Sequence, residues 1–95
     1  MKTLLRPYEG TLPYLFVSYA HKNDAAVLEI IRTLQSRGFR VWYDEGIEAG
    51  SEWPESIASH LERAQLVLAF LSPAYLQSDN CRKEMHYALT KKKPV

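Results

Sequence analysis

One carboxylate in this chain is placed where it could act on a bound ligand. Glu84 lies early in a stretch with the spacing of a short helix, just after the polar residues 78–83. The apolar run 66–71 precedes that stretch and is typical of a buried strand. Ligands of open α/β sheets bind where the carboxyl ends of strands meet the loops and helices that follow. We therefore expect Glu84 near a binding site, where a single carboxylate can support glycosidic chemistry.

The position of Glu84 around its helix bears on whether it can act. It falls about 60° from Cys81 and about 40° from Ala88, on the flank of the apolar stripe. A carboxylate on this flank would be partly desolvated, and its charge would be focused. The alternative is a solvated side chain, which is the usual state of a helical glutamate.

Further polar side chains follow the first apolar stretch, residues 14–19. Ser18, Tyr19 and His21 lie at or just beyond its end, where a helix N-terminus can meet a phosphate and a ring can stack on a base. The chain has neither the glycine pattern of a dinucleotide fold nor a P-loop. A role for His21 as a base is less favoured than that of an ordinary loop residue, and no histidine or cysteine spacing indicates zinc.

Two tryptophans flank an acidic, glycine-containing loop. Trp42 alternates with Val41 and should face the other side of the sheet, whereas Trp53 fits the buried stripe of the next helix. Such a loop indicates a moving lid or a partner contact. Its residues are Asp44, Glu45, Gly46, Ile47, Glu48, Ala49 and Gly50.

Composition places the chain among small globular proteins. It has 95 residues, enough for one domain, and 46% of them are hydrophobic. Its net charge of +1 argues against a nucleic-acid binder, and no apolar run is long enough for a membrane span. One cysteine allows no internal disulfide. We expect a cytoplasmic protein that contacts neither nucleic acid nor membrane and holds no metal or cofactor.

The pattern of apolar residues predicts alternating strands and helices. Strands are expected at 14–19, 39–43 and 66–71, each followed by a helix, with residues 1–13 as a leader and residues 94–95 starting a fourth strand. This order implies a parallel sheet with right-handed crossovers. The expected inner face of the first helix is Val27, Ile30, Ile31 and Leu34, and that of the last is Cys81, Met85, Ala88 and Leu89.

Helix ends are marked by capping residues. Asn23 or Asp24 can cap the first helix, and Gly38 can end it. Ser72 before a proline can cap a short helical turn, and Ser78 or Asp79 can cap the last helix.

Four segments in order resemble a TIR (Toll/interleukin-1 receptor) domain of the bacterial type. They are 15–20 with Asp24, 38–53, 64–75 and the pattern Ser78-x-x-Cys81-x-x-Glu84. The resemblance covers residues 14–89 and implies a flavodoxin-like parallel sheet with helices on both faces. A complete TIR domain has about five strands. Residues 14–95 would then hold its first three β-α units and be incomplete at the C-terminus.

The resemblance also implies a function. Many similar domains cleave the bond between nicotinamide and ribose in NAD+, with a glutamate that falls on Glu84. Ser18, Tyr19 and His21 would line the substrate pocket, with Trp42 or Trp53 near the nicotinamide. The loop 44–50 would contact other TIR domains in immune or stress signalling. The alternative is a TIR interaction module without catalysis.

Overall fold

The computed structural model describes residues 7–43 and 55–95 of the chain. The loop 44–50 and Trp53, both singled out by the sequence, lie outside the described residues. Within the described part, the elements are β1 (Leu15–Ser18), η1 (His21–Asn23), α1 (Asp24–Ser36), β2 (Val41–Tyr43), α2 (Glu55–Arg63), β3 (Leu66–Ala69), α3 (Pro73–Gln77) and α4 (Asp79–Thr90).

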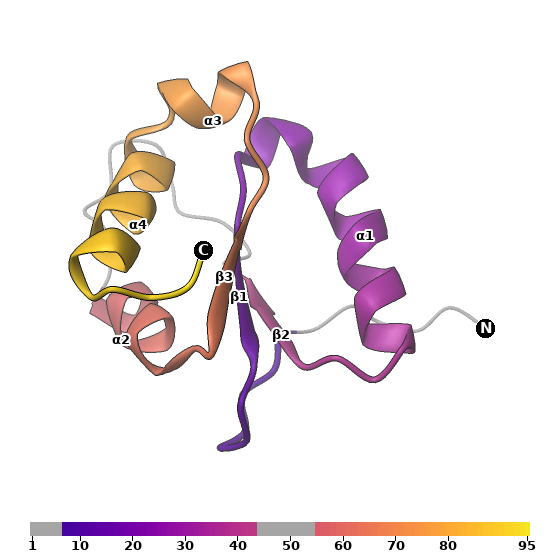
Figure 1. The fold of residues 1–95 in the computed structure, drawn as a ribbon. Coiled ribbons are helices and arrows are strands. Elements are labelled where there is room, and N and C mark those ends of the chain that lie inside the picture. Colours follow the sequence, from indigo (N-terminus) through magenta and orange to yellow (C-terminus); the bar gives the residue numbers. More distant parts are fainter. Residues whose placement is uncertain (1–6, 44–54) are drawn as a thin grey trace.

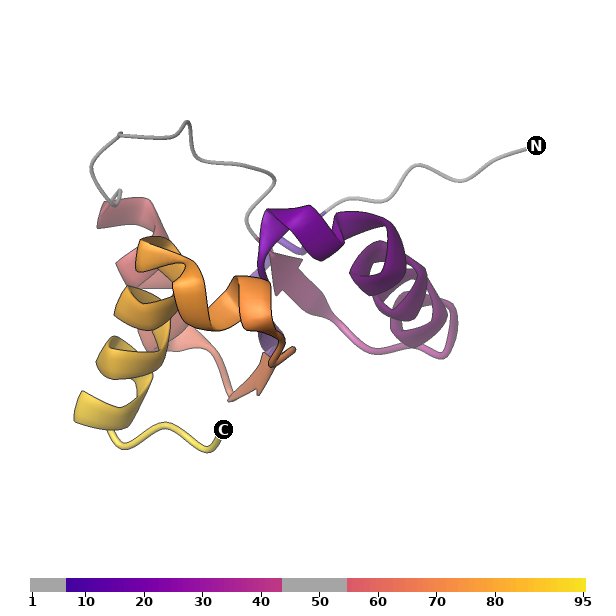
Figure 2. The same cartoon turned by 90° about the horizontal axis from the view of Figure 1, so that it is seen from above.

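The described strands form a parallel sheet in the order β2-β1-β3. Leu15 pairs with Val41 on one side and with Leu66 on the other, so all the strands start level. Helix α1 covers one face of the sheet, and α2 and α4 cover the other (Figure 1). The view from above shows the same three layers (Figure 2). The predicted α/β fold with helices on both faces is therefore confirmed, and a parallel sheet with β1 central is the start of a flavodoxin-like order.

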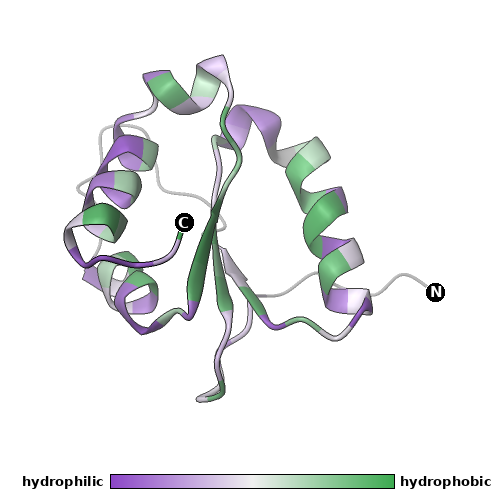
Figure 3. Ribbon diagram, in the orientation of Figure 1, coloured by the Kyte–Doolittle hydropathy of each residue, from purple (hydrophilic) through white to green (hydrophobic). Residues whose placement is uncertain are grey.

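Each face of the sheet has its own apolar core. Val17 and Val41 pack with Val27 and Ile31 on the α1 side, while Phe16 packs on the side of α2 and α4. Successive side chains of a strand point to opposite faces, which explains the division. Trp42 lies opposite Val41, as the alternation predicts. Strands covered on both faces are apolar throughout, as Figure 3 shows for the centre of the fold.

Several boundaries and faces differ from the sequence prediction. The strands are shorter than expected, although Phe70 N still donates to Ser18 O (3.0 Å) beyond the end of β3. Asn23 precedes α1 but makes no side-chain capping bond. Ile30 and Leu89 were expected inside and are 44% and 61% exposed, because each lies at the edge of its helix's apolar stripe.

Residues near both limits of the described chain bond to the sheet. Tyr8 N donates to Val41 O (2.8 Å), so the described part of the expected leader is attached to β2. Val67 N donates to Pro94 O (2.9 Å), which places residue 94 beside β3, where a fourth strand was expected. No helix of the described residues is long and apolar enough to cross a membrane.

Candidate active site

Helix α4 carries Glu84 into the protein. Ser78 caps the start of this helix, and its Oγ accepts from the backbone N of Cys81 (3.2 Å). The buried residues of α4 are Cys81, Glu84 and Ala88, spaced three and four apart on one face. Glu84 is 6% exposed, so it belongs to the inner face rather than to its flank.

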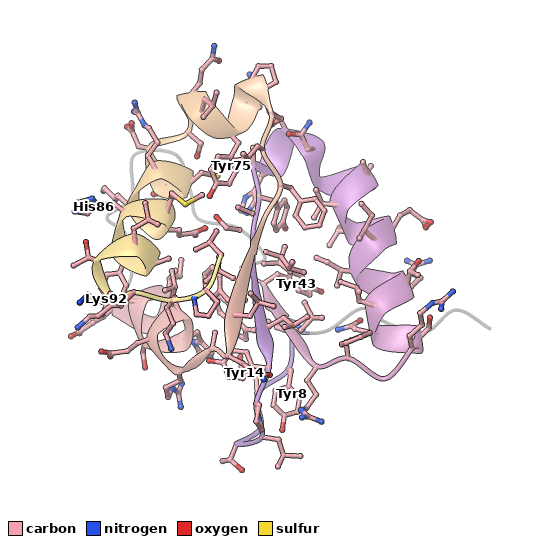
Figure 4. All side chains as sticks on the ribbon, in the orientation of Figure 1. Tyr8, Tyr14, Tyr43, Tyr75, His86 and Lys92 are labelled. Atoms are coloured by element: carbon pink, nitrogen blue, oxygen red, sulfur yellow. The ribbon has the colours of Figure 1, made fainter. Side chains whose placement is uncertain are left out.

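A buried hydroxyl meets the Glu84 carboxylate. Ser18, the last residue of β1, is 1% exposed and donates from Oγ to Glu84 Oε1 over 2.6 Å. Ser18 Oγ also lies 2.7 Å from the hydroxyl of Tyr75, which is 2% exposed. Figure 4 shows Tyr75 at the upper end of the sheet, between α3 and α4. Residues from β1, α3 and α4 thus converge on one carboxylate.

Tyr75 is held in place by the cap of its own short helix. Ser72 Oγ accepts from Tyr75 N (3.0 Å) and donates to Asn23 Oδ1 (2.8 Å). The predicted Ser72 and Ser78 caps are therefore confirmed. The oxygen of Asn23, which was expected to cap α1, serves instead to join α3 to the segment after β1.

A cavity of about 340 Å³ lies beside Glu84. The segment after β1 forms one wall, and α3 with the first turns of α4 forms the other. The lining residues are Tyr19, Ala20, His21, Lys22, Ala74, Gln77, Ser78, Asn80, Cys81 and Glu84. The cavity thus opens where the carboxyl end of β1 meets the next helix, as ligand sites of open α/β sheets do.

The structure brings together part of the predicted site. Tyr19 and His21 line the cavity with Glu84, and their rings lie 5.0 Å apart. Ser18 lies behind Glu84 and is not among the lining residues. Trp42 does not line the cavity either: its indole stacks on Phe16 and on His60, with ring centroids 5.2 and 4.2 Å apart.

Trp42, on the outer strand β2, belongs to a separate polar cluster. Its Nε1 donates to Glu9 Oε2 (3.1 Å), and His60 Nε2 lies 3.0 Å from Glu9 Oε1. His60 Nδ1 lies 2.7 Å from Ser56 O, so both ring nitrogens of this histidine have partners within the protein.

Burial controls the ionisation of the groups around Glu84. Burial, against the opposing effect of the Ser18 hydrogen bond and with smaller contributions from Cys81 and Glu84, raises the pKa of Tyr75 to about 12. Burial also raises the pKa of the Cys81 thiol, with a smaller contribution from Glu84. At neutral pH both groups are therefore uncharged, and Tyr75 remains a hydrogen-bond donor.

Sequence reasoning missed several residues of this site. Lys22, Gln77 and Asn80 line the cavity, and Tyr75 supports it from behind. The signal for Tyr75 was its place three residues after the Ser72 cap, which turns it toward the sheet. The described residues contain no group of three His, Cys, Asp or Glu side chains that could hold a metal ion.

Residues 15–95 match the family of TIR domains. The chain belongs to that family. This confirms the resemblance of the four sequence segments and explains the parallel sheet with β1 at its centre.

A curated relative is the NAD(+) hydrolase TcpA of Theionarchaea archaeon (strain DG-70-1). The TIR domain described here is 30% identical to it over 73 residues, which are 75% of this chain and 22% of the relative. The chain thus spans about a fifth of that relative's length. Within that length, this TIR domain places one buried carboxylate on the wall of a cavity that also holds aromatic, amide and cationic side chains.

Proposed function

We propose that this TIR domain hydrolyses NAD+ at the bond between nicotinamide and ribose, with Glu84 as the catalytic residue. The observation that carries the proposal is the burial of the Glu84 carboxylate beside the cavity at the end of β1. A relative named as an NAD(+) hydrolase supports the choice of substrate.

The chemistry suits a site with a single carboxylate. The C1′–N bond breaks and its electron pair goes to the nicotinamide nitrogen, which is cationic in NAD+, so the leaving group needs no proton. The ribose becomes oxocarbenium-like, as in glycoside hydrolysis. Glu84 would stabilise that positive charge and hold the ribose hydroxyls, and water would add at C1′ and release one proton to the solvent.

The remaining lining residues suit the other parts of NAD+. The rings of Tyr19 and His21 can stack on a planar group, and Lys22 offers a positive charge to the diphosphate. Ligand pockets occupy about 300–1,000 Å³, so a cavity of about 340 Å³ fits the nicotinamide riboside end better than the whole dinucleotide. Residues beyond this cavity would hold the adenosine.

Release of nicotinamide from NAD+ tests the proposal. Wild type, Glu84→Gln and Glu29→Gln are compared at high protein concentration. The Glu29 side chain is exposed on α1, on the other face of the sheet, so its variant is a matched loss of one carboxylate. We expect release from wild type and Glu29→Gln and none from Glu84→Gln. Absence of release from a folded wild type would contradict the proposal.

A second candidate function is association with other TIR domains in signalling, without catalysis. Leu71 and Leu76, before and within α3, are 67% and 64% exposed and offer apolar side chains for such a contact. Sedimentation of wild type and Leu76→Asp tests this. Association that is lost in Leu76→Asp, with no nicotinamide release from wild type, would favour this function over hydrolysis.

A further inference from the structure

We infer that Tyr75 and Ser18 form a directional hydrogen-bond relay that positions the Glu84 carboxylate and keeps it ionised. Both are positioning residues in this inference, because neither lines the cavity. The assignment of a catalytic task to the relay rests on the proposed function, whereas its effect on Glu84 can be measured without it.

The direction of the relay follows from counting protons. An ionised Glu84 can only accept, so the single hydroxyl proton of Ser18 is used in the 2.6 Å hydrogen bond to Glu84 Oε1. The 2.7 Å contact between Ser18 Oγ and Tyr75 can then be made only if the Tyr75 hydroxyl donates. The proton order is therefore from Tyr75 to Ser18 and from Ser18 to the carboxylate.

This order favours the charged form of Glu84. A carboxylate accepts a hydroxyl proton most strongly when it is ionised, and an O–H···O⁻ bond is then short, at about 2.5–2.7 Å. Hydrogen bonds in a chain also polarise one another, so donation by Tyr75 strengthens donation by Ser18. Because the pKa of Tyr75 is raised to about 12, the first donor of the relay keeps its proton across the working range of an enzyme.

The relay offsets a specific cost. Burial disfavours a charged carboxylate, and Glu84 is 6% exposed. Among the described residues, the groups near it include Tyr19, His21 and Lys22 from the segment after β1, Tyr75 from α3, and Cys81 from its own helix. Of these, Tyr75 reaches Glu84 through a serine that is itself buried, where water does not compete for the hydrogen bonds.

Two features fix the geometry of the relay. Tyr75 N donates to the Ser72 cap, and Ser72 donates to Asn23, so the tyrosine is anchored from the far side. Ser18 is the last residue of the central strand β1, which is paired on both sides. The position of Glu84 Oε1 is therefore fixed by the sheet through Ser18. Small movements of α4 cannot reorient the carboxylate freely.

The decisive measurement is the ionisation of Glu84 itself. Its carboxyl carbon, isotopically labelled, is followed by NMR through a pH titration in wild type, Tyr75→Phe and Ser18→Ala. Tyr75→Phe preserves the buried ring and removes only the hydroxyl. We expect the Glu84 midpoint to rise by about one pH unit in Ser18→Ala and by a smaller amount in Tyr75→Phe. The double variant should titrate like Ser18→Ala, because Tyr75 acts through Ser18.

Tyr14→Phe is the matched control. Tyr14 is also buried, its hydroxyl donates to His60 O, and it lies at the opposite end of the sheet (Figure 4). We expect it to leave the Glu84 midpoint unchanged. An unchanged midpoint in Tyr75→Phe, or a double variant that exceeds Ser18→Ala by the full Tyr75→Phe effect, would overturn the relay.

Kinetics provide a second, separate readout. If wild type releases nicotinamide, Tyr75→Phe should lower kcat about tenfold with little change in KM, and the acidic limb of its kcat–pH profile should move to higher pH. A normal profile together with a normal Glu84 midpoint contradicts the inference. If wild type releases no nicotinamide, only the proposed function is contradicted. The NMR titration still tests whether Tyr75 and Ser18 affect the ionisation of Glu84.

Discussion

Ser18 and Glu84 are 66 residues apart in the chain, and their side-chain oxygens lie 2.6 Å apart. The pair joins the central strand β1 to the last helix α4, so the site exists only when α4 is packed against β1. Tyr75 completes the arrangement from α3, which lies next to α4 in the chain. The carboxylate is therefore held by the fold rather than by its own helix, and this has consequences that can be measured.

Glu84→Gln should retain the fold, whereas Glu84→Leu should not retain full stability. The glutamine Oε1 can still accept from Ser18, so we expect a free energy of unfolding within about 1 kcal/mol of wild type. Leucine leaves the buried hydroxyl of Ser18 without its acceptor, at a cost of about 1–3 kcal/mol. Urea denaturation of both variants measures the difference. Equal stabilities would show that the Ser18 bond contributes nothing.

Substitutions of His21 and of Trp42 should have different effects on substrate binding. His21 lines the cavity, and Trp42 packs against Phe16 and His60 instead. If the domain cleaves NAD+, we expect His21→Ala to raise KM about tenfold, the loss of one good contact, while Trp42→Phe leaves KM unchanged. Trp42→Phe should lower stability because the indole donates to Glu9. A raised KM in Trp42→Phe would indicate that this tryptophan contacts the substrate after all.

The Ser72 side chain is expected to contribute more to the free energy of unfolding than that of an ordinary exposed serine. Its Oγ caps α3 and also holds Asn23, so Ser72→Ala loses two hydrogen bonds at once. We expect a loss of about 1–2 kcal/mol by chemical denaturation. Ser36→Ala is the control, since that hydroxyl bonds only a carbonyl of its own exposed helical turn. Equal losses in the two variants would mean that the Ser72 bridge is not formed in solution.

The sequence predicted the order of strands and helices because that information is local. Apolar runs, Gly38 at positive φ and the serine caps of α3 and α4 each depend on a few neighbouring residues. The buried face of α4 was harder to predict, because Cys81 and Ala88 fit two different apolar stripes along the helix. The expected stripe included Met85 and Leu89 and therefore left Glu84 on its flank. In the structure, the buried stripe is the one that contains Glu84, and Leu89 is exposed.

The candidate site was predictable only where it lies near strand ends. Tyr19, His21 and Glu84 follow β1 or β3 in the chain, so their common edge could be inferred from the parallel order. Trp42 could be assigned to a face of the sheet by alternation, but alternation does not give its distance from the cavity. The role of Ser18 depends on Tyr75, a contact across 57 residues that no local pattern specifies.

Glu9 should make stability depend on acid pH. Its carboxylate lies against His60 and accepts from Trp42, and the hydrogen bond from His60, followed by that from Trp42, lowers the pKa of Glu9 below its ordinary value. A lowered folded-state pKa adds stability that is complete above the ordinary carboxyl range and is lost as pH falls through the folded value. Because the Glu9 side chain is 66% exposed, the contribution is no more than about 1 kcal/mol.

Denaturation of wild type and Glu9→Gln at about pH 7 and about pH 3 measures this contribution. We expect Glu9→Gln to be the less stable protein at neutral pH and the two to converge at the acid end, where wild-type Glu9 is itself protonated. Glu29→Gln, exposed on α1, should follow wild type at both values. A stability difference between Glu9→Gln and wild type that stays constant from neutral to acid pH would show that packing of residues 7–13 against β2, not the charge of Glu9, holds this segment in place.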